Sequence, residues 1–213
     1  MKIGIIGSGV VGQALGTGFV NLGHEVKLAS RDPGRDSIKD WVSGAGCGAS
    51  AGTHADVAVW CDLAVLATSW DGTENAVQLA GPSNLAGKVV VDVTNPLDFS
   101  SGGPALAVGH TDSGGETMQR WLAESKVVKA FNSIGSQHMV SPDFSDGPPD
   151  MFICGNDAVA KEVVSRICKD FGWGVVDLGG IEGSRYIEPL ALIWITHLIN
   201  TGSGDHVFKQ LRK

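Results

Sequence analysis

The stretch IGIIGSGVVG, residues 3–12, decides the fold of this chain. The apolar run Met1–Ile6 is typical of a buried parallel strand, and it leads directly into the complete G-x-G-x-x-G motif of residues 7–12. Apolar side chains then recur on one helical face from Val11 to Leu22. A strand, a glycine loop and a helix in this order predict a unit that binds a dinucleotide.

Each glycine of the motif has its own role in such a unit. Gly7 allows the tight turn, Gly9 lets the backbone approach a pyrophosphate, and Gly12 lets the helix pack against the strand. Free N–H groups at the start of the helix would hold the anion. Because the chain has 30 glycines among 213 residues, the motif alone leaves open a glycine-rich turn of another α/β fold. The second apolar strand, Val26–Ala29, favours the dinucleotide site.

The end of the second strand indicates which dinucleotide binds. Sites for NAD place Asp or Glu there, where the carboxylate accepts hydrogen bonds from the ribose 2′-OH. This chain has Ser30 and Arg31, with Arg35 close behind, and these groups suit a 2′-phosphate. The sequence therefore predicts NADP as the cofactor. Asp32 and Asp36 leave open an alternative, in which the arginines pair with carboxylates instead.

Composition and charge exclude several classes of protein. A net charge of −7 and a pI near 5.2 argue against nucleic acid or an anionic membrane as a partner. The longest apolar run, Pro189–Ile199, is too short to span a bilayer, and no signal peptide is expected before a strand that starts at residue 1. The four cysteines form no C-x-x-C pair, so we expect buried free thiols in a cytoplasmic protein.

Expected strands and helices alternate along the chain. Strands are expected at 1–6, 26–29, 63–67, 89–93, 126–130, 151–154 and 173–178, with a short one near Ala49. Helices are expected at 37–42, 54–60, 73–79, 113–124, 157–171, 185–200 and 205–211, and the loop 100–112 shows no clear structure. This alternation predicts an α/β protein with a Rossmann-type, doubly wound, mostly parallel sheet.

Polar residues follow two of the buried strands. Ala67-Thr68-Ser69-Trp70 follows one strand, and Thr94-Asn95-Pro96 follows the next. Ligands of parallel sheets bind beyond the carboxyl ends of the strands, so both segments should face the crevice of the glycine loop. Each is also compatible with an ordinary turn, and Trp70 with simple packing; their shared location favours a role in lining the cofactor site.

Six blocks of sequence together resemble a known family, the NADP oxidoreductases that depend on the deazaflavin coenzyme F-420. They are also similar to the cytosolic NADPH domains of the mammalian six-transmembrane metalloreductases. The blocks are Gly7–Gly12, Ser30-Arg31, Leu63–Trp70, Val127–Ile134, Cys154–Asp157 and Gly183–Glu188. A generic dinucleotide-binding sequence does not require the last three, and the resemblance covers nearly the whole chain.

The resemblance implies one domain, residues 1–213, in which a core of residues 1–130 is followed by a small α/β extension, residues 131–213. It also implies a homodimer, with NADP across the strand ends and a deazaflavin or flavin ring stacked on the nicotinamide. The NADP site would be lined by Ser8, Val10, Val11, Ser30, Arg31, Arg35, Thr68, Ser69 and Trp70. Asn132, Ser133 and Ile134 would lie near the nicotinamide and the acceptor ring. The deazaflavin enzymes have His-Thr-Ile-Pro where this chain has Asn132-Ser133-Ile134-Gly135.

The expected activity is hydride transfer between NADP(H) and a flavin-like acceptor, which is coenzyme F-420 or FMN/FAD. We find no catalytic triad and no motif with metal-ligand spacing, and direct transfer between two rings needs neither. Positioning by Asn132, Ser133 and Ile134 would then replace an essential acid or base. Two rivals remain: an NADPH-binding sensor or scaffold without activity, and an imine reductase or hydroxyacid dehydrogenase. The second rival needs roughly a hundred more helical residues to close its substrate site.

The last long helix predicts a second chain as partner. Apolar residues between Ile187 and Ile199 occupy every face of this helix. Such a helix is either fully buried or packed against its twin across a two-fold axis. We expect a homodimer.

Overall fold

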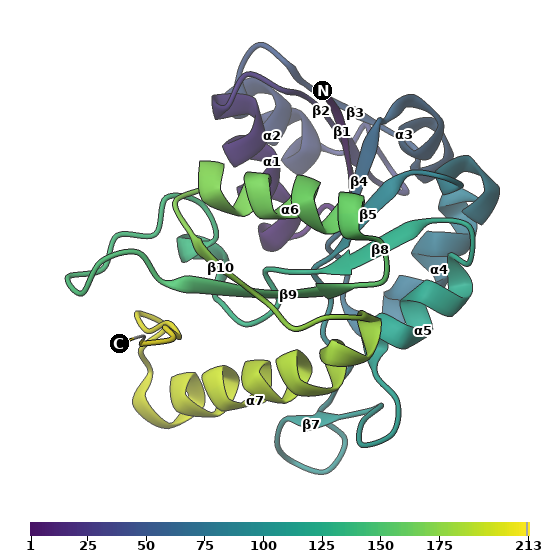
Figure 1. Cartoon of the computed structure of the whole chain (residues 1–213). Coiled ribbons are helices and arrows are strands. Elements are labelled where there is room, and N and C mark those ends of the chain that lie inside the picture. The colour runs from purple at the N-terminus through teal and green to yellow at the C-terminus, as the bar shows by residue number, and fades with distance from the viewer. Residues whose placement is uncertain (212) are drawn as a thin grey trace.

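The computed structural model describes residues 1–211 and 213, and within them a central sheet carries helices on both faces (Figure 1). Its strands, with a small hairpin formed by β6 and β7, are β1 (Lys2–Ile6), β2 (Glu25–Ala29), β3 (Ala49–Gly52), β4 (Leu63–Leu66), β5 (Val89–Asp92), β6 (Leu97–Asp98), β7 (Ala105–Leu106), β8 (Lys126–Lys129), β9 (Asp150–Gly155) and β10 (Gly174–Asp177). The helices are α1 (Val10–Asn21), α2 (Asp36–Ala45), α3 (His54–Trp60), α4 (Trp70–Ala80), α5 (Gly114–Trp121), α6 (Ala158–Asp170) and α7 (Ser184–Thr201).

Among the described residues, eight strands form one sheet in the order β10-β9-β8-β5-β4-β1-β2-β3. The strands from β8 to β3 are all parallel. Strands β2 and β3 add to one side of β1, and β4, β5 and β8 then add to its other side, which is the strand order of a doubly wound fold. Strand β9 then pairs antiparallel with β8, and β10 is parallel to β9. The predicted Rossmann-type, mostly parallel sheet with a small C-terminal α/β extension is confirmed.

Alternation along β1 explains how one strand serves two layers. Ile3 and Ile5 lie in the apolar cluster under α1, α2 and α6, whereas Ile6 lies in the cluster under α3, α4 and α5. All three side chains are fully buried, which accounts for the unbroken apolar run in the sequence. Gly4 sits where any side chain would press on α3, since its Cβ would be 2.8 Å from Cγ1 of Val57.

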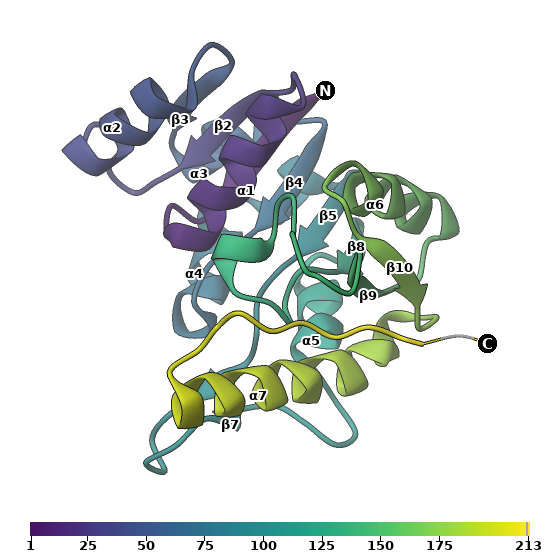
Figure 2. The same cartoon turned by 90° about the vertical axis from the view of Figure 1, so that its left-hand side faces the viewer.

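The end of the chain differs from the sequence expectation. A helix at 205–211 is wrong: this segment is irregular and runs back along α7 toward β9 (Figure 2). Its backbone groups form hydrogen bonds with distant parts of the chain, whereas in a helix they would bond to one another. The carbonyl of Phe208 accepts from the N–H of Asp150 at 3.1 Å, and the carbonyl of His206 accepts from Nε1 of Trp194 at 2.8 Å.

Two smaller expectations also need correction. The loop 100–112 contains strand β7, which pairs antiparallel with β6; both strands are two residues long, too short to show a periodic pattern. Cys47 is exposed, whereas the other three cysteines are buried; it lies in a turn between Gly46 and Gly48, where no apolar layer covers it. All four are free thiols.

Helix α7 is long as expected, and only part of it is covered by the rest of the chain. Ile187, Ala191 and Trp194 are buried against the rest of the chain. On the other side Tyr186 is 72% and Ile193 59% exposed. Among the described residues, none of the helices combines the length and apolar character needed to cross a bilayer.

Candidate dinucleotide-binding site

Two adjoining cavities lie at the carboxyl ends of the parallel strands. The larger, of about 600 Å³, lies beyond β1, β2 and β4, and the smaller, of about 380 Å³, lies beyond β4 and β5. They share a wall made of Gly9, Ala67, Thr68 and Ser69. The glycine loop and the segment after β4 therefore meet at the junction of the two cavities, as the strand order requires.

The glycine loop has the geometry that its sequence predicts. Gly7 has a φ of +128°, and a Cβ there would collide with the carbonyl oxygen of Ala67. A Cβ on Gly12 would collide with the carbonyl oxygen of Gly7, so α1 packs directly on the turn. Gly9 differs from both, because a Cβ there would find nothing within 4 Å. Its backbone thus borders open space at the start of α1, where free N–H groups favour an anion.

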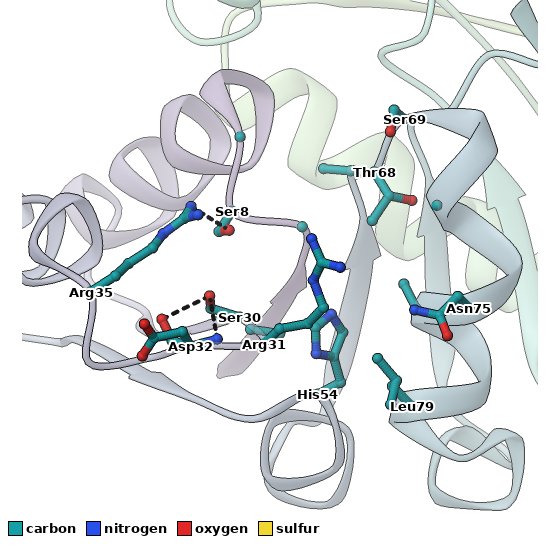
Figure 3. A pocket seen from close by; sticks show the side chains of 16 residues that line it. Ser8, Ser30, Arg31, Asp32, Arg35, His54, Thr68, Ser69, Asn75 and Leu79 are labelled. Carbon is teal, nitrogen blue, oxygen red and sulfur yellow. Dashed lines mark hydrogen bonds between the residues drawn. The ribbon is translucent and has the colours of Figure 1, made fainter.

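The larger cavity carries the basic residues that the sequence singled out. Ser30 is 4% exposed, and its Oγ accepts from the N–H of Asp32 at 3.2 Å, which shapes the turn after β2. Arg35 reaches across the cavity, and its Nη2 donates to Oγ of Ser8 at 3.0 Å (Figure 3). Arg31 extends into the cavity beside His54. Within the described part of the chain neither arginine forms an ion pair with Asp32 or Asp36, so the alternative pairing is not observed.

Sequence reasoning missed the far wall of this cavity. Its residues come from α4 and from the first turn of α3, and they are Gly72, Asn75, Ala76, Leu79 and His54. The four from α4 have the spacing of one helical face, which is a signal that was present in the sequence. The Thr53 side chain and Asp56 form a capping box that starts α3 at the carboxyl end of β3, and this places His54 at the cavity.

The smaller cavity is mostly apolar and lies at the other end of the site. Residues from α1 and α4 and the segments after β4 and β5 line it, namely Gly9, Val10, Val11, Ala67, Thr68, Ser69, Trp70, Asp71, Val93, Thr94, Asn95, Leu97 and Phe99. The ring of Trp70 stacks on Trp121 with 5.6 Å between centroids. Phe99, at the tip of β6, is 58% exposed and forms an apolar rim that the sequence did not indicate.

Five of the sequence-predicted site residues do not line either cavity, and the first is Gly12, which packs against the turn at Gly7. Pro96 is absent from both walls, and Asn132, Ser133 and Ile134 are buried, with 5%, 6% and 7% of their surface exposed. Asn132 instead supports a residue that does line the smaller cavity. Its Nδ2 donates to Oδ1 of Asn95 at 2.9 Å, and Nδ2 of Asn95 donates to the carbonyl of Asn132 at 2.7 Å.

A buried ion cluster lies directly behind this wall. The ammonium of Lys129 is fully buried, 2.9 Å from Oδ2 of Asp92 and 3.0 Å from Oε1 of Glu188, and it donates to the carbonyl of Thr94 at 2.7 Å. Burial alone would lower the pKa of Lys129, but the two carboxylates more than offset it and raise the pKa above its ordinary value. Asp92 also accepts from the N–H and hydroxyl of Thr94, at 2.9 and 2.7 Å. Both backbone groups of Thr94 are thus held, its N–H by Asp92 and its carbonyl by Lys129.

Comparison with known proteins identifies the family. The family model described as NADP oxidoreductase coenzyme F420-dependent matches residues 2–96. A crystal structure of a candidate F420-dependent NADP reductase from Arthrobacter sp. FB24 superposes with a TM-score of 0.94, at 39% identity and over 100% of both chains. The F420-dependent NADP reductase of Methanothermobacter marburgensis is 30% identical, over 92% of this chain and 91% of its own. The chain belongs to the F420-dependent NADP oxidoreductase family. It is therefore counted among the NADP-dependent oxidoreductases.

A second group of relatives to this oxidoreductase has a much longer chain. Metalloreductase STEAP3 of Rattus norvegicus is 29% identical over 90% of this chain, which spans 36% of the length of the metalloreductase. The similarity to both groups agrees with the resemblance inferred from the six sequence blocks.

The three most distinctive of those blocks meet at the ion cluster of this oxidoreductase. Lys129 belongs to the block at 127–134, and Glu188 belongs to the block at 183–188. Cys154, from the third block, lies opposite Lys129 in the β8–β9 pairing, and its Sγ is 3.2 Å from Oγ of Ser184. Burial raises the pKa of the Cys154 thiol to about 11, which makes it an inert packing group. The blocks therefore form one structural unit behind the smaller cavity.

Proposed function

We propose that this protein transfers a hydride between NADP(H) and a flavin-like acceptor, the deazaflavin coenzyme F420 or FMN/FAD, by direct ring-to-ring transfer. The observation that carries the proposal is the pair of adjoining cavities, one basic and one apolar, on either side of the glycine loop. A dinucleotide that lies across this loop would place its 2′-phosphate at the basic end and its nicotinamide at the apolar end.

The basic cavity suits the 2′-phosphate end of NADP. Ser30, Arg31 and Arg35 offer a hydroxyl and two guanidinium groups for a 2′-phosphate dianion, and the open space at Gly9 lets a pyrophosphate reach the start of α1. Charge-assisted hydrogen bonds contribute about 1.5–3 kcal/mol each, so we expect at least tenfold tighter binding of NADPH than of NADH.

The acceptor end fits a planar ring. Bound NADPH supplies the hydride chemistry itself, which leaves positioning and exclusion of water to the protein. Trp70, Leu97 and Phe99 present apolar surface to such a ring, while Thr94 and Asn95 offer polar groups at its edge. The contacts of Thr94 with Asp92 and of Asn95 with Asn132 restrict the motion of this edge.

An acceptor panel under single-turnover conditions tests the proposal. The protein is mixed with NADPH and with coenzyme F420, FMN or FAD, and in a separate reaction with an imine and no flavin. The absorbance of NADPH and of the acceptor is followed. We expect stoichiometric transfer to at least one acceptor. Tight NADPH binding without transfer to any of the three would favour the rival function, an NADPH-binding sensor or scaffold, and transfer to an imine without a flavin would favour the imine reductase.

The arginine at the end of β2 provides a matched pair of variants. Arg31→Ala should weaken NADPH binding about tenfold or more, with little effect on NADH, because only NADPH carries the 2′-phosphate. The control Arg166→Ala removes an exposed arginine of α6, which lies outside both cavities and pairs with Glu162 at 3.7 Å. Equal loss in both variants, or no loss in Arg31→Ala, would refute the assignment of the 2′-phosphate site.

We also propose that residues 1–213 act as one domain, with 131–213 as an extension that supports the acceptor end, and that two chains pair through α7. Continuity of the sheet across β8 and β9 supports the first proposal. The exposed apolar residues Tyr186, Ile193 and Ile199 on α7 support the second.

A further inference from the structure

His54 is a buried histidine that faces the basic cavity. It is the first residue of α3, held there by the capping box of Thr53 and Asp56, and only 8% of its surface is exposed. It lines the same cavity as Ser30, Arg31 and Arg35 (Figure 3). Within the described part of the chain its ring forms no hydrogen bond, so the imidazole is oriented by its helix and by packing.

Few charged groups lie around this ring, and among them Arg31 acts on it most strongly. The loop after β2 brings Arg31 beside it, and the same loop carries Asp32 and Arg35 on the cavity wall. Helix α4 faces it with the uncharged Asn75 and Leu79. On its own helix, Asp56 is engaged by Thr53. The nearest strong field is therefore the positive charge of Arg31.

This environment keeps the imidazole neutral when the site is empty of phosphate. Burial and then the charge of Arg31 lower the pKa of His54 below its ordinary value of 6.5. A bound 2′-phosphate would bring about two negative charges to Arg31 and reverse the sign of this field. The protonated imidazole would then be favoured, and it would add a third cation to the phosphate site.

We propose that His54 is a specificity-determining residue of the 2′-phosphate site, and that it takes up a proton when a 2′-phosphorylated dinucleotide binds. The inference rests on the proposed assignment of Ser30, Arg31 and Arg35 to the 2′-phosphate. It goes further by making the choice of NADP over NAD depend on pH. The protein binds NADP most tightly on the acid side of neutrality, whereas its affinity for NAD changes little.

The linkage between proton uptake and binding determines in which direction, and over which pH range, the affinity for NADP changes. A group whose pKa rises on binding takes up protons, and the affinity increases as the pH falls through the pKa of the complex. Each unit by which the pKa rises amounts to a factor of about ten in affinity at low pH. The phosphate itself titrates near pH 6, and its protonation acts in the opposite direction. Measurements at about pH 7 therefore separate the two groups.

Isothermal titration calorimetry in two buffers of different ionisation enthalpy measures the proton uptake directly. NADP⁺ and NAD⁺ are titrated into the wild type and into His54→Gln at about pH 7, in PIPES and in imidazole. We expect uptake on the order of half a proton per site with NADP⁺, and none with NAD⁺. His54→Gln should abolish the uptake and reduce the preference for NADP⁺ about three- to tenfold. His24→Gln is the matched control, because His24 lines neither cavity and also has a lowered pKa.

The outcomes separate this inference from the assignment on which it rests. Equal affinity of the wild type for NADP⁺ and NAD⁺ would refute the 2′-phosphate site itself. A clear preference for NADP⁺ with no proton uptake, or with the same uptake in His54→Gln, would overturn only the role of His54. The comparison of the two cofactors in the wild type needs no variant, so it stands even if His54→Gln fails to fold.

Discussion

Replacing Lys129 by methionine tests the ion cluster that holds the acceptor end of the site. The ammonium is fully buried and is the cation that faces both Asp92 and Glu188, at 2.9 and 3.0 Å. Methionine keeps much of the length and the apolar stem of the lysine side chain. It removes the ammonium group, so two buried carboxylates lose their shared cation. Removing one partner from a buried ion pair costs about 3–5 kcal/mol.

The remaining contacts hold the cost of the two carboxylates at the lower end of that range, about 3 kcal/mol. Asp92 keeps two hydrogen bonds from Thr94, and Glu188 keeps two from the N–H groups of Gly114 and Gly115. The carbonyl of Thr94 loses the Lys129 donor, which costs a further 1–3 kcal/mol or so if no water replaces it. We expect a loss of about 4 kcal/mol at pH 7, a large part of the typical total of about 5–15 kcal/mol.

Urea unfolding of the apo-protein, followed by far-UV circular dichroism, measures this loss. Lys126→Met is the matched control on the same strand, because Lys126 pairs with Asp157 at 3.2 Å in a partly exposed position and should cost about 0–1 kcal/mol. A difference of less than about 1 kcal/mol between the two variants would refute the reasoning. The cluster would then be compensated by groups other than Lys129.

Three further outcomes follow from the loop, from α5 and from α7. Gly9→Ala should weaken NADPH binding but leave the unfolding free energy within about 0.5 kcal/mol of wild type. Gly12→Ala should destabilise the fold, because the new Cβ would meet the backbone at Gly7. Equal unfolding midpoints for the two variants would contradict this. A hydrogen bond from Arg185 holds the pKa of Glu116 below its ordinary value of 4.5, so the stability from this pair is present above that pH and is lost as the pH falls through the lowered pKa. Glu116→Gln should therefore flatten the acid side of the stability–pH curve, and an unchanged slope in acid denaturation would count against the pairing. Sedimentation equilibrium at micromolar concentration should give a dimer mass for wild type and a lower average mass for Ile193→Asp, which adds a charge to the exposed face of α7; a monomeric wild type would exclude the interface.

Local sequence patterns were sufficient for most of the fold. Continuous apolar runs such as Leu63–Leu66 mark strands buried on both faces, and the boundaries of α3 at His54 and Trp60 agree with the sequence expectation. The expected helix at 205–211 failed because its backbone hydrogen bonds go to distant residues such as Asp150. Helix propensity reports only what a segment does with its own neighbours.

In the candidate site, too, local motifs could be predicted from the sequence, whereas long-range contacts could not. The glycine loop and the Ser30-Arg31 pair are short, local motifs, and their residues line the cavities where strand order places them. Phe99 and His54 were missed, since a single aromatic or histidine in a loop or first helical turn has no pattern around it. Asn132 was expected at the ring, but it lies behind Asn95, 37 residues away in sequence, and acts on the cavity through that side chain.

The sequence alone determined the doubly wound sheet, the dinucleotide loop, the basic residues after the second strand and the family. All of these depend on the order of residues within short segments, where periodicity and glycine spacing have direct structural meaning. Only the tertiary structure decided which buried groups meet, as when Glu188 reaches Lys129 and the start of α5 across more than 50 residues. Apolar periodicity reports that a side chain is buried but not which partner it meets there. The partners of a buried charge are therefore decided by the packing of the whole chain.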